Sequence, residues 1–65
     1  MIFIRTKFGI VYAKDSIVNI DNDRRVEGIL VFNESDEEIC EVPFRTESEL
    51  SDNPNLIEKI LEEYY

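Results

Sequence analysis

Carboxylates are the side chains with which this sequence could do chemistry. Its 65 residues include 15 Asp and Glu against 7 Lys and Arg, which gives a net charge of -8. Eight of the acids fall in two stretches of the second half of the chain, and we take them as one candidate protein-binding surface. They are Glu34, Asp36, Glu37, Glu38, Glu41, Glu58, Glu62 and Glu63. Such an array attracts cationic groups when the fold brings its members together.

The remaining inventory argues against an enzyme. The chain has no His, so it offers neither a Ser-His nor a Cys-His pair. Its single cysteine, Cys40, lies between Ile39 and Glu41 in a segment with strand character, where a neighbouring carboxylate raises the pKa of a thiol. We therefore expect Cys40 to be a buried core residue, and we predict no catalytic residues.

Metal and cofactor sites are not indicated either. One Cys and no His exclude the usual zinc sites. The run Asp21-Asn22-Asp23 begins like a calcium loop, but Val26 occupies the position that requires glycine and Phe32 the position that requires the bidentate glutamate. With only two glycines in the chain, there is no phosphate-binding loop. We predict no metal and no cofactor.

The charge is unevenly divided, and this bears on the partner. Residues 1–33 hold four acids and five bases, whereas residues 34–65 hold eleven acids and two bases. An acidic surface repels nucleic acid and anionic lipid and favours a basic protein partner. The first half does interleave bases with aromatic residues, as oligonucleotide-binding barrels do, but the excess of acids makes direct nucleic-acid binding a poor fit. The alternative is that the acids only keep a small protein soluble.

Five segments with β-branched and aromatic residues are the elements that must position these acids. We expect strands at residues 1–6, 10–13, 17–20, 26–33 and 38–44. Lys14-Asp15-Ser16 is interpreted as a polar break between the second and third strands. Gly28 marks a bulge or a close approach of the helix backbone, and Pro43, which lacks an N–H, marks an edge strand or a strand end. Because the connections are short, neighbouring strands must be antiparallel.

The last stretch is the predicted helix. Its apolar residues recur with the spacing of one helical face, at Leu56, Ile57, Ile60, Leu61 and Tyr64. Asn53 is the expected N-cap and Pro54 the first helical residue, so that the helix runs over 54–65. One further helical turn is expected around 47–50. We predict a single α+β domain over 1–65, in which a five-stranded antiparallel meander is covered on one face by a C-terminal helix.

Two resemblances follow from this layout. The layout of the chain resembles that of short uncharacterised bacterial and phage proteins, for which no active residues are assigned. The segments that carry this resemblance are the turn Lys7-Phe8-Gly9, the strand Ile17-Val18-Asn19-Ile20, the acidic turn and the final helix. In size and charge the chain also resembles small phage-encoded inhibitors, including anti-CRISPR proteins and other DNA mimics. That resemblance implies an acidic face that occupies the nucleic-acid channel of another protein.

Three functions remain open at this point. The first is a non-enzymatic binding protein that contacts a basic surface of another protein. The second is a counter-defence inhibitor that mimics nucleic acid, and the third is a homodimer joined by edge strands or by the uncovered sheet face. No apolar run of about 18 residues exists and the N-terminal stretch does not resemble a signal peptide, so we expect no membrane association and a cytoplasmic location.

Overall fold

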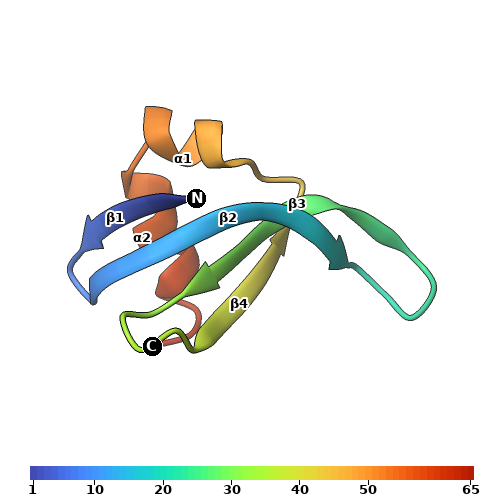
Figure 1. The fold of residues 1–65 in the computed structure, drawn as a ribbon, viewed down its shortest axis with the longest axis horizontal. Helices are drawn as coiled ribbons and strands as arrows, with labels where there is room; N and C mark the ends of the chain where they lie inside the picture. Colours follow the sequence, from blue (N-terminus) through green and yellow to red (C-terminus); the bar gives the residue numbers. More distant parts are fainter.

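A computed structural model describes all of residues 1–65 as one antiparallel sheet with two short helices (Figure 1). The strands follow the chain order β1-β2-β3-β4. Their bounds are Ile2–Thr6 for β1, Gly9–Asn19 for β2, Arg25–Phe32 for β3 and Glu38–Pro43 for β4. The helices are α1, Glu47–Asp52, and α2, Asn55–Leu61. The predicted α+β class and antiparallel meander are therefore confirmed. Neither helix is long and apolar enough to cross a membrane.

The sheet has four strands where we expected five. The predicted polar break does not interrupt pairing, because Lys14, Asp15 and Ser16 pair with Leu30, Ile29 and Gly28 of β3. A polar side chain on an exposed position costs a strand little, since its backbone N–H and C=O still enter the ladder. The two predicted strands are thus one continuous β2, which crosses the whole molecule and forms a projecting arm with β3 (Figure 1).

The predicted C-terminal helix, 54–65, is shorter in the structure, where α2 spans Asn55–Leu61. Asn53 does not cap α2 with its side chain; it ends α1 instead, with its backbone N–H donating to the Glu49 carbonyl at 3.0 Å. Pro54 precedes α2 as its cap residue, and α2 stops at Leu61. The predicted turn around 47–50 is confirmed as α1. Thr46 is its N-cap residue, and the Thr46 hydroxyl accepts from the Glu49 N–H at 3.1 Å.

Both helices pack on the same face of the sheet, and in Figure 1 α2 lies behind β1 and β2. The core residues come from both layers and include Val11, Ala13, Ile29, Val31, Cys40, Leu50, Ile57 and Leu61. Of the predicted helical stripe, Ile57 and Leu61 are buried and two further residues are half-buried, but Tyr64 is exposed because the helix ends before it. The opposite sheet face carries no helix.

Glycine is required at position 28 because the neighbouring strands β2 and β4 approach it closely, whereas we expected a bulge or the backbone of a helix there. A Cβ at this position would lie 2.5 Å from the Val42 carbonyl oxygen and 2.7 Å from a Val18 methyl group. The register shift lies elsewhere, between Val31 and Phe32. β4 is an edge strand that ends at Pro43, as its missing N–H predicts.

Candidate protein-binding surface

Three segments that are distant in sequence meet at one end of the molecule. They are the β1–β2 turn, the β3–β4 turn and the chain that follows α2 (Figure 1). The Lys7 backbone N–H donates to Glu58 at 2.6 Å, and the Lys7 ammonium pairs with Glu62 at 2.6 Å. The ring of Phe8 stacks on that of Tyr65 with centroids 4.9 Å apart. These contacts fix the C-terminal segment against the β1–β2 turn.

The β3–β4 turn is held in shape by Asn33. Its side-chain oxygen accepts from the N–H groups of Ser35 and Glu37 at 2.9 and 3.0 Å, and its amide donates to the Glu37 carboxylate at 3.2 Å. Asp36 adopts a φ of 64°, the left-handed conformation that Asp tolerates better than most residues. The side chain of Asn33 thus takes the place of ladder bonds and presents the following acids in one fixed turn.

The structure brings together six of the eight predicted acids. We define the acidic end as the carboxylates of the β3–β4 turn with the two that follow α2, namely Glu34, Asp36, Glu37, Glu38, Glu62 and Glu63. All six are exposed. Of the remaining two, Glu58 is half-buried beneath Lys7 and Glu41 lies apart, on the sheet face without helices.

Lys7 neutralises part of this end. Its hydrogen bond and charge lower the pKa of the Glu62 carboxyl, and the same contact raises the pKa of Lys7. The turn acids Glu34, Asp36 and Glu38 form no ion pair within the chain. They are therefore available to an external cation.

Cys40 lies beneath the acidic end with 6% of its surface exposed. Burial raises the pKa of its thiol to about 11, and the charges of Glu38 and Glu63 contribute to the same shift. The thiol is therefore protonated at neutral pH, and its burial agrees with the prediction from sequence. Charges from both the β3–β4 turn and the segment after α2 thus act on the same thiol.

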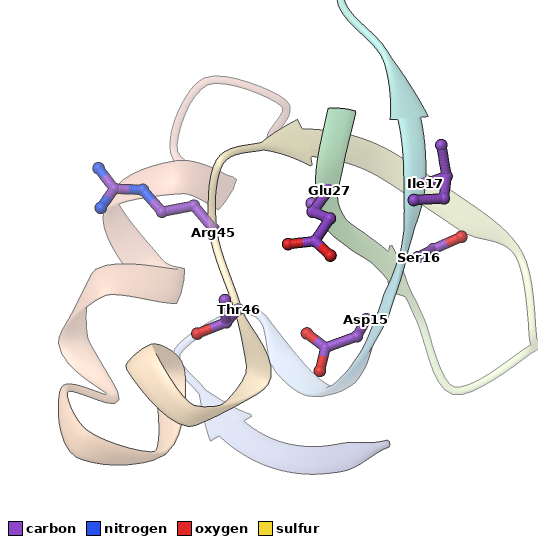
Figure 2. A pocket seen from close by; sticks show the side chains of 7 residues that line it. Asp15, Ser16, Ile17, Glu27, Arg45 and Thr46 are labelled. Atoms are coloured by element: carbon purple, nitrogen blue, oxygen red, sulfur yellow. The ribbon is translucent and has the colours of Figure 1, made fainter. Parts of the chain in front are cut away.

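A pocket of about 320 Å³, lined mostly by polar residues, lies at the opposite side of the fold and was not predicted from the sequence (Figure 2). Asp15 binds Glu47 there through reciprocal bonds of 2.8 and 2.9 Å between carboxylates and backbone N–H groups. Figure 2 shows the Asp15 and Glu27 carboxylates turned toward the opening, whereas the Arg45 guanidinium points away from it. Arg45 pairs with Glu49 at 3.0 Å.

Residue patterns do not predict this pocket, because they place Asp15 in a polar break between two strands. Only the paired register of β2 and β3 places Asp15 and Glu27 on the same side. Asp15 is tied to the start of α1, so its fixed role is to join that helix to the sheet. Nowhere in the structure do three His, Cys, Asp or Glu side chains come together in a way that could hold a metal ion.

The chain was compared with protein-family models, curated proteins and solved structures, and none of them matches it.

Proposed function

We propose that this protein is a non-enzymatic binding protein whose acidic end docks on a basic surface of another protein. The observation that carries the proposal is the meeting of two acidic segments from opposite parts of the chain, the β3–β4 turn and the segment after α2, around one short basic turn.

The acidic end has the properties of a preformed docking site. Its turn is fixed by three hydrogen bonds to the Asn33 side chain, so little conformational entropy is lost on binding. The stacked pair Phe8 and Tyr65 lies among the acids and supplies rigid apolar area beside the charges. Carboxylates around an aromatic centre suit lysine and arginine side chains, which bring both a charge and an apolar stem.

We further propose a cytoplasmic location. The single Cys40 is free and buried, which suits a compartment in which thiols stay reduced.

The test compares two double variants of equal net charge. Glu34→Gln with Glu38→Gln removes two charges from the acidic end, and Asp23→Asn with Asp52→Asn removes two exposed charges elsewhere. The immobilised protein captures partners from a host-cell lysate, the captured protein is identified by mass spectrometry, and its affinity for each variant is measured at low and high salt. We expect the acidic-end variant to bind at least about tenfold more weakly and the control to bind as the wild type does. Equal losses in the two variants, or an affinity that salt does not change, would contradict the proposal.

Nucleic-acid mimicry is a narrower form of the same proposal, and the captured partner distinguishes it. A mimic would bind a nucleic-acid-binding protein, and duplex DNA would displace the acidic end from it. A partner that binds the acidic end and is not displaced by DNA supports general protein binding instead.

A further inference from the structure

The sheet face without helices carries a continuous row of aromatic side chains. Phe3, Tyr12 and Phe32 pair directly across β1, β2 and β3. Their ring centroids are separated by 5.4 Å and 5.5 Å in succession. Phe3 is 69% exposed, so the row is open to solvent at its β1 end. Leu30 extends the apolar surface toward β4.

Charges of opposite sign lie beside this row toward its two ends. Lys14, Leu30 and Glu41 form the next cross-strand row, on the same face, because they are paired in register two residues along from the aromatic row. Arg5 shares the face with Phe3. The β1–β2 half of this face is therefore basic and the β4 half is acidic. None of Arg5, Lys14 and Glu41 forms an ion pair within the chain.

We propose that this face binds a second copy of the chain, with a two-fold axis that runs parallel to the strands between β2 and β3. Such an axis places the β1–β2 half of one copy over the β3–β4 half of the other. Tyr12 then lies over Phe32 of the second copy, and Lys14 lies beside Glu41 of the second copy. Two-fold symmetry makes each of these contacts twice. Two twisted sheets pack in this aligned manner with about 10 Å between them.

The charge pattern selects a second copy as the occupant. A partner of uniform charge would be attracted to one half of the face and repelled by the other, whereas the face is complementary to itself after the rotation. Single-stranded nucleic acid also stacks on aromatic rows, but it would meet Glu41 beside the row. Pairing through the β4 edge is disfavoured, because Pro43 removes a donor and the acids Glu38 and Glu41 of the two copies would come close together.

The dimer has a consequence for the acidic end, although it does not rest on the proposed function. Because the axis is parallel to the strands, the β1–β2 and β3–β4 turns of both copies lie at the same end of the dimer. The two acidic ends are thereby placed side by side and form one wider surface. Two linked sites of this kind bind a partner with matching sites far more tightly than one does.

The first experiment is sedimentation equilibrium over micromolar concentrations, at about 0.15 M salt so that long-range repulsion is screened. We expect a reversible monomer–dimer equilibrium. Phe3→Ser removes an aromatic ring from the face, and Phe44→Ser is the matched control, because Phe44 is also 69% exposed but follows the end of β4. Phe3→Ser should raise the dissociation constant at least about tenfold and Phe44→Ser should leave it unchanged. A wild-type protein that stays monomeric throughout, or equal effects of the two variants, overturns the inference.

The second experiment tests the orientation of the axis. Lys14→Glu and Glu41→Lys each place like charges together in a dimer, so each variant alone should be mainly monomeric. An equimolar mixture of the two restores both opposite-charge pairs and should dimerise as the wild type does. Circular dichroism checks that each variant is folded. If the mixture does not recover dimer, or if the oligonucleotide dT15 binds the wild-type face in place of a second copy, the proposal is wrong.

Discussion

At the scale of single residues, the acidic end is a set of carboxylates whose neighbours differ. Glu62 has a cation at 2.6 Å, whereas Glu38 and Glu63 lie over a buried thiol. The sequence identifies these residues as acidic but contains no signal for their neighbours, since Lys7 and Glu62 are separated by almost the whole chain. What each carboxylate can bind is decided by these contacts.

The thiol of Cys40 should react slowly with iodoacetamide in the folded protein. With a pKa of about 11, only about one thiol in a thousand is ionised at pH 8, against about a quarter of free thiols. Alkylation followed by mass spectrometry should therefore be at least about a hundredfold slower than in urea, where the ordinary thiol pKa returns. A rate equal to that of a free thiol would show that Cys40 is not buried.

Glu62 should titrate below its ordinary range, and Lys7→Gln should remove this shift. The hydrogen bond and charge of Lys7 favour the carboxylate, so the pKa of Glu62 is lower in the folded state than in the unfolded state. The pair therefore contributes stability above the ordinary glutamate pKa of about 4.3, and this contribution is lost as the pH falls through the lower folded value. An NMR titration of the side-chain carboxyl carbon in both proteins measures it. Identical curves for Glu62 in both proteins would contradict the observed pairing.

At the scale of elements, the alternation of apolar residues predicted the strands more accurately than the polar stretches predicted where strands end. Predicted strands at 1–6, 26–33 and 38–44 agree closely with β1, β3 and β4, because alternation of apolar residues reports which face is buried. The predicted break at residues 14–16 is wrong because a polar stretch need not end a strand, and β3 supplies partners for its backbone. Local sequence could not reveal that pairing, since it depends on the register of another segment.

The candidate site shows the same division. The turn that carries Glu34, Asp36 and Glu37 was predicted from its turn-forming residues, which act locally. From the sequence, the grouping of this turn with the end of α2 rests on charge alone, because local residue patterns do not determine how α1 and α2 cross the sheet. Glu41 was assigned to the same surface on sequence proximity alone, yet it lies on the sheet face without helices, paired with Leu30.

Both strands beside β3 approach it closely at Gly28, so Gly28→Ala should destabilise the sheet. The new methyl group would lie 2.5 Å from the Val42 carbonyl oxygen, which belongs to the β4 backbone and cannot rotate away. We expect the free energy of unfolding to fall by about 1–3 kcal/mol. Urea denaturation measures the change, and Ser16→Ala, at the paired position on β2, is the control that should stay within about 0.5 kcal/mol. A neutral Gly28→Ala would mean that β3 and β4 are further apart than described.

At the scale of the whole molecule, a core of ten buried apolar side chains must support 65 residues. All of the helical cover lies on one face of the sheet, so the other face contributes little apolar burial in a single copy. A domain of this size commonly depends on additional burial against a partner. The aromatic row, with Phe3 exposed at its end, offers apolar surface for such burial. Stability and self-association should therefore be linked.

This linkage predicts that the melting temperature rises with protein concentration. Folded copies that dimerise are removed from the unfolding equilibrium, and a hundredfold excess over the dissociation constant stabilises a folded state by about 2.7 kcal/mol. For a domain of this size, each kcal/mol raises the melting temperature by about 4–8 °C. Calorimetry over a hundredfold range of concentration should show a rise of at least about 5 °C in the wild type. The rise should persist in Phe44→Ser and be smaller in Phe3→Ser, whose dimer forms only at higher concentrations. A melting temperature that is independent of concentration in all three proteins would mean that the single copy is the stable unit and that the aromatic row has no role in folding.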